Sequence, residues 1–197
     1  MKAPTRRALA KQQTRAKVLA AARRLFSEQG YEGATIRDIA AAAGMSTGAV
    51  FANFADKSDL FREIMITDMA ALGEAMREAA SHGDGVEDAI LRAFMAGYAF
   101  YMTQLPLARA AFSVGWSTED GPALRGAAAA RSLRDLIAER LTRTAQGDAQ
   151  AALRADMLFE AYLSNYPQAI FENWTLDDLR ARSRDQIGIL LAGLPRD

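Results

Sequence analysis

The chain has 197 residues, of which half are hydrophobic, 24 are acidic and 24 are basic, and none is cysteine. The missing cysteine excludes disulfides, thiolate metal sites and thiol redox sensing. Abundant alanine and scarce proline favour helix, so we expect an all-α chain of about nine helices.

Four helices are predicted in the first 80 residues, over positions 14–29, 35–43, 46–53 and 57–80. Gly30 follows the first helix in the position that glycine favours, and Gly44 ends the second. Thr35 begins a Thr-x-x-Asp capping signal. Ser46 and Asp56 are suited to cap the third and fourth helices. The third helix is therefore short and lies between two longer ones.

Five more helices are predicted further along, over positions 86–105, 106 to about 112, 124–145, 149–171 and 175–192. Pro106 is expected to break the first of these from the second, and Pro167 to kink the helix that contains it. Residues 81–85 and 115–122 read as loops. Thr175 repeats the capping signal at the start of the last helix.

Basic and acidic residues are unevenly distributed along the chain. Residues 1–63 hold 11 Lys and Arg against 6 Asp and Glu, whereas residues 64–197 hold 13 against 18. A basic N-terminal part favours contact with a polyanion, although a solvated basic arm gives the same pattern. The basic residues in this arm are Lys2, Arg6, Arg7, Lys11, Arg15 and Lys17.

The sequence shows no secretory or membrane-spanning segment and no recognised catalytic motif. The N-terminus has no apolar segment typical of a secretory signal, and the longest apolar run, 94–102, is well short of the ~20 residues of a membrane helix. We therefore expect a cytoplasmic protein without a membrane partner or cofactor. The sequence contains no metalloprotease, nucleophile-elbow, phosphate-loop or dinucleotide motif. His82 is expected at the surface, and Asp156 with Glu160 on a solvated or salt-bridged helix face, so we expect no enzyme.

The second and third predicted helices form a helix, a tight turn and a short helix. Val50 and Phe54 are one turn apart and are expected to pack inward. The outer side is then left to small or polar residues and one aromatic ring: Ser46, Thr47, Gly48, Phe51, Ala52 and Asn53. A thin helix of this kind suits the major groove of DNA, about 12 Å wide. A helical hairpin that only packs against the rest of the chain is the alternative.

The stretch "AARRLFSEQGYEGATIRDIAAAAGMSTGAVFANFADKSDLF", residues 21–61, resembles the TetR family of bacterial transcriptional regulators. The resemblance implies a DNA-binding head over residues 1–56 and a helical effector-binding and dimerising body over 57–197, linked by helix 57–80. It also implies a ligand-responsive regulator, a repressor in most of the family, that binds a near-palindromic DNA operator as a homodimer. A TetR-like ligand-binding or scaffold module that does not repress an operator is the alternative function.

By matching position, the resemblance implies that Thr35 and Lys57 contact DNA phosphates. With the outer side of the third helix, the expected DNA-binding residues are Thr35, Ser46, Thr47, Gly48, Phe51, Asn53 and Lys57. Many relatives have Tyr where this chain has Phe51 and His where it has Asn53. The Phe51 ring can contact a thymine methyl, while Asn53 can bind either a phosphate or an adenine edge.

An aromatic and methionine stripe runs along helix 86–105 and continues after it. Such a stripe is typical of plain core, but the resemblance implies a pocket here for a small, mostly apolar effector. The expected ligand-binding residues are Phe94, Tyr98, Tyr101, Gln104, Phe112 and Trp116. The resemblance also implies dimerisation through the last two helices, as a four-helix bundle, against the alternative of an intramolecular core. The expected interface residues are Phe159, Leu163, Tyr166, Ile170, Ile187, Leu190, Leu191 and Leu194.

Overall fold

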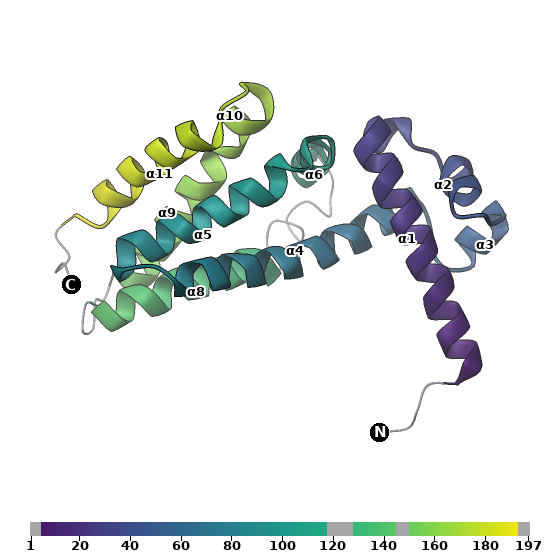
Figure 1. The fold of residues 1–197 in the computed structure, drawn as a ribbon, viewed down its shortest axis with the longest axis horizontal. Coiled ribbons are helices and arrows are strands. Elements are labelled where there is room, and N and C mark those ends of the chain that lie inside the picture. Colours follow the sequence, from purple (N-terminus) through teal and green to yellow (C-terminus); the bar gives the residue numbers. More distant parts are fainter. Residues whose placement is uncertain (1–4, 118–127, 145–149, 193–197) are drawn as a thin grey trace.

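The computed structural model describes residues 5–117, 128–144 and 150–192, and the described residues are helical without a strand. Their ten helices are α1 (Arg6–Gly33), α2 (Ile36–Ala42), α3 (Thr47–Phe51), α4 (Lys57–Ser81), α5 (Gly85–Met102), α6 (Leu105–Ser117), α8 (Ala128–Thr144), α9 (Ala151–Ser164), α10 (Tyr166–Phe171) and α11 (Leu176–Leu190). The all-α prediction is confirmed. Figure 1 shows α1, α2 and α3 gathered at one end, with α4 running from them into the larger bundle of the other helices.

The head is built on the predicted caps and turns. Gly30 has φ 76° inside α1, so the regular helix stops there and one further turn follows. Thr35 and Ser46 each accept a hydrogen bond from a backbone N–H of the first turn of α2 and α3. Gly44 adopts φ 70° between these two helices, a conformation that residues with a side chain rarely adopt. The tight turn therefore depends on this glycine.

Helix α4 contributes to two separate hydrophobic cores. Its N-terminal part, from Leu60 to Met65, packs with α1, α2 and α3 in what we call the head cluster. From Leu72 onward it packs with α5, α8, α9 and α11 in the body cluster. Both cores share this continuous helix, so a rotation of its N-terminal part relative to its C-terminal part must bend α4.

Helix α5 is the centre of the body, in contact with α4, α6, α8, α10 and α11. Burial on nearly all sides agrees with its almost continuous apolar sequence. The helix ends at Met102, three residues before the predicted end. Pro106 is the second residue of α6 rather than part of the break, since proline is tolerated in the first turn of a helix.

Helix α6 is longer than the sequence pattern predicted and lies between the two cores. It continues to Ser117, so the predicted loop is wrong for residues 115–117, and the rest of that loop lies outside the described residues. Leu107 and Ala110 pack in the head cluster, whereas Ala108 packs in the body cluster. Alternate sides of α6 therefore contact the head and the body.

The predicted helix 149–171 is divided into α9 and α10 at Asn165. The predicted kink at Pro167 thus falls two residues earlier, because proline lies in the first turn of α10 and residues before it tend to leave helical geometry. The last helix, α11, begins with the predicted capping box between Thr175 and Asp178.

Arginines from other helices cap several helix C-termini. The unpaired carbonyls at a C-terminus attract cations, yet none of α1, α3, α4, α10 and α11 has a basic residue in its last turn. Arg140 of α8 donates to Ala80 O at the end of α4, and Arg154 of α9 donates to Leu190 O at the end of α11. These bonds join helices that are distant in sequence. Among the described residues, no helix is long and apolar enough to cross a membrane.

Candidate nucleic-acid interface and effector hollow

The outer face of α3 is thin and exposed. Thr47 and Gly48 are exposed, and the Phe51 ring is 55% exposed. Val50 and Phe54 are buried in the head cluster, as their spacing predicts. Among the described residues, a Cβ built on Gly48 would meet only Ser46 Oγ, at 3.9 Å, so no internal contact requires glycine here. The absence of a side chain at Gly48 therefore leaves room for another molecule to approach the exposed face of α3.

Two hydroxyls of the predicted interface also hold the helix starts. Ser46 Oγ accepts from the Ala49 N–H at 3.2 Å, and Thr35 Oγ1 accepts from the Asp38 N–H at 3.2 Å. Thr35 Oγ1 further donates to the Asp38 carboxylate at 2.5 Å. Both residues are exposed, so each hydroxyl keeps the adjoining helix N-terminus ordered at the surface.

Asn53 is turned back onto its own helix. Its Nδ2 donates to Ala49 O at 2.9 Å, and its Oδ1 is buried and has no hydrogen-bond partner among the described residues. In this arrangement the amide orders the end of α3. A contact from Asn53 to a phosphate or an adenine edge requires the side chain to rotate outward.

Lys57 contacts the end of α1. Its Nζ donates to Tyr31 O at 2.9 Å, lies 4.3 Å from the centre of the Tyr31 ring and is 3.8 Å from a Glu32 carboxylate oxygen. An ammonium has three N–H donors, so a phosphate can be added to the Tyr31 contact. Burial, followed by the charge of Glu32, raises the pKa of the Tyr31 phenol.

Arg15 was grouped by the sequence with the basic arm, but it joins three parts of the head. Its Nη1 donates to Asn53 O at 2.5 Å, its Nη2 pairs with the Glu63 carboxylate, and its guanidinium lies 4.3 Å from the centre of the Phe54 ring. Arg15 thus connects α1, the end of α3 and α4. A long-range contact between side chain and backbone leaves no periodic signal in the sequence, which is why this role was missed.

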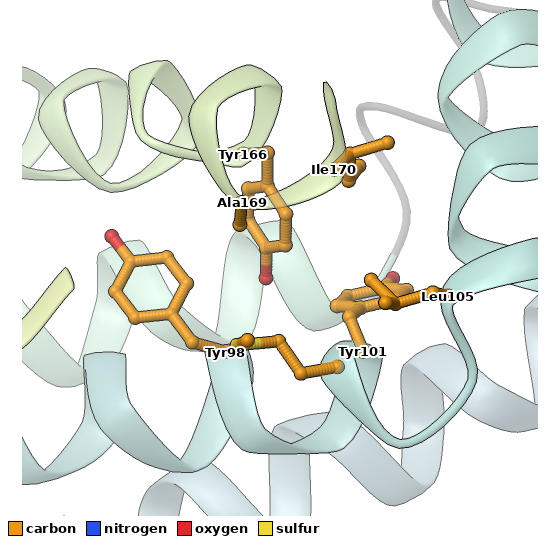
Figure 2. Close-up of a pocket in the computed structure, with 7 residues that line it drawn as sticks. Tyr98, Tyr101, Leu105, Tyr166, Ala169 and Ile170 are labelled. Carbon is orange, nitrogen blue, oxygen red and sulfur yellow. The ribbon is translucent and has the colours of Figure 1, made fainter. Parts of the chain in front are cut away.

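The body contains a cluster of tyrosines from α5, α9 and α10. The Tyr98 and Tyr162 rings stack with centroids 4.9 Å apart, and Tyr166 meets Tyr98 and Tyr101 edge-on at 5.4 and 5.3 Å. Figure 2 shows a small hollow beside them. Its lining residues are Tyr98, Tyr101, Met102, Leu105, Tyr166, Ala169 and Ile170. In this form it is too narrow to admit a water molecule.

Hydrogen bonds tie this cluster to α11. The Tyr98 hydroxyl donates to Tyr162 O at 3.1 Å and accepts from Asn165 Nδ2 at 3.0 Å, and Asn165 also donates to Gln186 Oε1 at 2.9 Å. Burial raises the pKa of Tyr98 to about 12, although the bonds from Ser183 and Asn165 act in the opposite direction. Burial likewise raises the pKa of Tyr101, Tyr162 and Tyr166.

A buried ion pair connects the head to the rim of the hollow. Asp68 of α4 is 4% exposed, and Arg23 of α1 pairs with both of its carboxylate oxygens. The same guanidinium donates to Gln104 Oε1 at 3.3 Å, between α5 and α6. Gln104 directly precedes Leu105, which lines the hollow, so the head and the hollow share one polar contact network.

The contacts of His82 and of the Asp156–Glu160 pair are structural and do not indicate a catalytic or metal site. No group of His, Cys, Asp and Glu among the described residues could hold a metal ion. His82 is exposed and its ring nitrogen bonds to Glu78 O. Asp156 and Glu160 both face Arg134, at 3.3 and 3.5 Å, so of the two expected arrangements, solvated or salt-bridged, the face is salt-bridged.

Comparison with known proteins agrees with the geometry of the head. Residues 18–64 match the family model for bacterial regulatory proteins of the tetR family. In these residues the chain is similar to the TetR family. It is 45% identical over 65 residues to the transcriptional repressor AcnR of Corynebacterium glutamicum, covering 33% of this chain and 35% of AcnR. It is 41% identical over 81 residues to the regulator AcrR of Shigella flexneri, covering 41% of this chain and 38% of AcrR.

These two matches span little more than a third of the relatives' length. The fold of nearly the whole chain is matched by a solved structure of a transcriptional regulator from Rhodococcus sp. RHA1, with a TM-score of 0.71 and 23% sequence identity. That match covers 91% of this chain and 97% of the Rhodococcus chain. At this identity it shows the fold of the body and nothing of its ligand.

The hollow in the body differs from the sequence prediction in its lining residues. Tyr98 and Tyr101 line the hollow as expected, but Phe94 is fully buried in the body cluster and Gln104 faces Arg23. The side chains of Phe112 and Trp116 lie outside the described residues. The sequence prediction missed Met102, Leu105, Tyr166, Ala169 and Ile170 as lining, because they come from a second helix or a helix end.

The residues predicted for the dimer interface differ in how deeply they are buried. Phe159, Tyr166, Ile170 and Ile187 are buried within the chain itself, so their side chains cannot form a surface for a second subunit in this conformation. Leu163, Leu190 and Leu191 are half-buried against the body cluster, and Leu194 lies outside the described residues. Exposed apolar side chains of the same helices are Leu153, Met157 and Ile189. Periodicity identifies an apolar face but does not tell a core from an interface.

Proposed function

We propose that this protein is a transcriptional regulator that binds operator DNA through α2 and α3. The observation that carries the proposal is the outer face of α3, where exposed Thr47, Gly48 and Phe51 leave room for close approach while Val50 and Phe54 hold the helix to the head. The names of AcnR and AcrR support a role in transcription, and that of AcnR supports repression. Such a protein acts where the DNA is, which in bacteria is the cytoplasm.

The regulator is proposed to be a homodimer that reads a near-palindromic operator. Exposed Leu153 and Met157 of α9 and Ile189 of α11 are apolar surface that a second copy would cover, together with half-buried Leu163 and Leu190. Two-fold symmetry would place the two α3 helices about 34–36 Å apart, one turn of DNA. The DNA contacts proposed for each subunit remain Thr35, Ser46, Thr47, Gly48, Phe51, Asn53 and Lys57.

A small effector bound in the hollow is proposed to release the DNA. The ligand acts only if it binds the released conformation more tightly than the DNA-bound one, typically by about 1–3 kcal/mol. Widening the hollow must displace Tyr101, Met102 or Leu105, which lie beside Gln104 and its bond to Arg23. Leu107 and Ala110 of α6 would carry the same displacement into the head cluster.

The DNA-binding proposal is tested by a gel-shift titration with DNA that flanks the protein's own coding region. We expect specific retardation that a scrambled fragment does not compete. Thr47→Ala, on the exposed start of α3, should weaken it at least tenfold, about 1.4 kcal/mol. Thr142→Ala, an exposed threonine on α8, is the matched control and should leave it unchanged. Equal retardation of both fragments, or none, would favour a ligand-binding module without an operator.

A further inference from the structure

We propose that the effector is an uncharged aromatic compound of one or two rings that carries a hydrogen-bond acceptor, and that it binds between Tyr98, Tyr101 and Tyr166. The inference rests on the proposed function in taking the hollow as the effector site. It concerns the chemical class of the ligand, which neither the family nor the relatives' names specify.

The hydrogen-bond acceptor on the ligand is inferred from a phenol proton that has no partner in the tyrosine cluster. The hydroxyls of Tyr162 and Tyr166 form a hydrogen bond with each other, and both residues are buried. Two facing hydroxyls share only one of their two protons, and the part of the chain that the structure describes supplies no acceptor for the second. Figure 2 shows the Tyr166 hydroxyl directed toward the space between Tyr98 and Tyr101. A ligand oxygen there would accept a bond that the buried phenols otherwise lack.

The rim of the hollow allows entry beside Tyr101. Tyr101, Met102 and Leu105 are partly exposed, whereas the other tyrosines of the cluster are buried. The Tyr101 hydroxyl donates to the Met69 thioether at 3.4 Å, and sulfur is a weak acceptor. Rotation of Tyr101 therefore costs only this weak hydrogen bond in addition to its ring contact with Tyr166, and Met102 is flexible. The hollow has no room for a water molecule in this conformation, so a ligand can enter only if Tyr101 or Met102 moves.

The ring geometry favours an aromatic ligand over a saturated one. Tyr166 meets Tyr98 and Tyr101 edge-on, and a flat ring that takes the place of a displaced Tyr101 ring would restore the edge-to-face contact with Tyr166. Aromatic pairs in these arrangements contribute more than the area they bury, and a saturated ring of the same shape lacks this contribution.

Charge around the hollow favours an uncharged ligand. None of its seven lining residues is ionised at neutral pH. Arg23, which reaches Gln104, already pairs with Asp68. Arg109 lies on the exposed surface and donates two hydrogen bonds to Ile170 O, at 3.3 and 3.1 Å. An ionised group in the hollow would lose its hydration without an opposite charge beside it.

The test compares four compounds of one skeleton by calorimetric titration of the full chain without DNA. The compounds are 2-naphthol, naphthalene, 2-naphthoate and decahydro-2-naphthol. We expect 2-naphthol to bind about tenfold more tightly than naphthoate and the saturated alcohol. Tyr166→Phe should weaken 2-naphthol about two- to tenfold and leave naphthalene unchanged, since only the hydroxyl is removed. Tyr31→Phe, in the head, is the control and should change neither affinity.

Equal or tighter binding of naphthoate, especially if Arg109→Ala abolishes it, would overturn the proposal of an uncharged ligand. Equal binding of decahydro-2-naphthol would overturn the aromatic class, and an equal loss for naphthol and naphthalene in Tyr166→Phe would overturn the hydrogen bond. If Tyr166→Phe does not fold, the comparison on the wild-type chain decides. Absence of binding by all four compounds, in a sample that still retards operator DNA, overturns this inference and leaves the regulator. Binding as expected in a sample that retards no DNA supports the ligand class and contradicts the proposed function.

Discussion

The Arg23 guanidinium spans both oxygens of the buried Asp68 carboxylate, with one N–O distance of 3.1 Å, and so joins the first helix of the head to the middle of α4. Breaking a buried pair from one side leaves a charge without a partner, which costs more than the pair contributes. Arg23 itself is 35% exposed, so solvent moderates this cost. The contact fixes how the head is held against the body.

Arg23→Ala should lower the free energy of unfolding by about 2 kcal/mol, because Asp68 would remain buried without its cation. Urea denaturation followed by circular dichroism measures it. The matched control is Arg77→Ala, which removes an exposed pair with Glu74 and should cost less than about 0.5 kcal/mol. Similar losses in the two variants would mean that the Arg23–Asp68 pair has no special role.

Gly48→Ala should separate stability from DNA binding. The added methyl fits against Ser46 Oγ at 3.9 Å, and alanine is a better helix former than glycine, so stability should rise by up to about 1 kcal/mol. The same methyl stands on the exposed face of α3, and operator affinity should fall at least tenfold, about 1.4 kcal/mol. Thermal unfolding and fluorescence anisotropy with labelled DNA measure the two effects. A variant that is more stable and binds DNA as the wild type does would show that α3 does not approach DNA at this position.

Arg15 and Lys11 should differ in their salt dependence, although both belong to the basic arm. Lys11 is exposed on α1, and if it pairs with a phosphate, Lys11→Ala should reduce the salt slope of DNA binding by about 1. Arg15→Lys keeps the charge but loses the forked contact with Asn53 O and Glu63, so the head should be less stable while the slope is unchanged. Titrations at four salt concentrations measure the slopes. A reduced slope for Arg15→Lys would place Arg15 on DNA.

The tyrosines should make the fold sensitive to alkaline pH. Because burial raises the pKa of these phenols above that of the unfolded chain, their contribution is fully present below about pH 10. This contribution to stability is lost as the pH rises through the pKa values of the phenols in the folded state, and the pKa of Tyr98 is about 12. Absorbance at 295 nm near pH 10.5 should therefore show little tyrosinate in the native protein and much more in urea. Equal tyrosinate in both conditions would show that the cluster is open to water.

Two isoleucines on α11 offer a matched pair for the dimer. Ile189 is 74% exposed, so Ile189→Asp should weaken self-association with little change in monomer unfolding. Ile187 is fully buried, and Ile187→Asp should unfold the chain by placing a charge in the core. Sedimentation velocity and circular dichroism distinguish the two. A wild-type chain that is monomeric at micromolar concentration would remove the proposed interface.

Local signals allowed much of the fold to be predicted. The caps at Thr35, Ser46 and Asp56 act within one helical turn, so the sequence contains both partners. The inward direction of Val50 and Phe54 likewise follows from helical spacing. These are the features that place the candidate DNA-binding face.

Features that depend on the approach of distant segments were not predicted. Pairs such as Arg23 with Asp68, 45 positions apart, form only once α1 and α4 are packed. Tyr166 was assigned to a dimer surface because its spacing is that of an apolar face, yet its ring completes the lining of the hollow. Whether an apolar face meets its own chain or another is decided by packing, which periodicity does not encode.

Cross-linking of α3 to DNA tests the central claim most directly. The chain has no cysteine, so a single cysteine at exposed Ala52, beside the outer face of α3, gives a unique thiol. Leu153→Cys, on the exposed surface of α9, is the control. With operator DNA that carries a disulfide-tethered base in its major groove, Ala52→Cys should form a covalent complex and Leu153→Cys should not. Equal yields from both sites, or a product from Leu153→Cys alone, would contradict the claim that α3 enters the DNA groove.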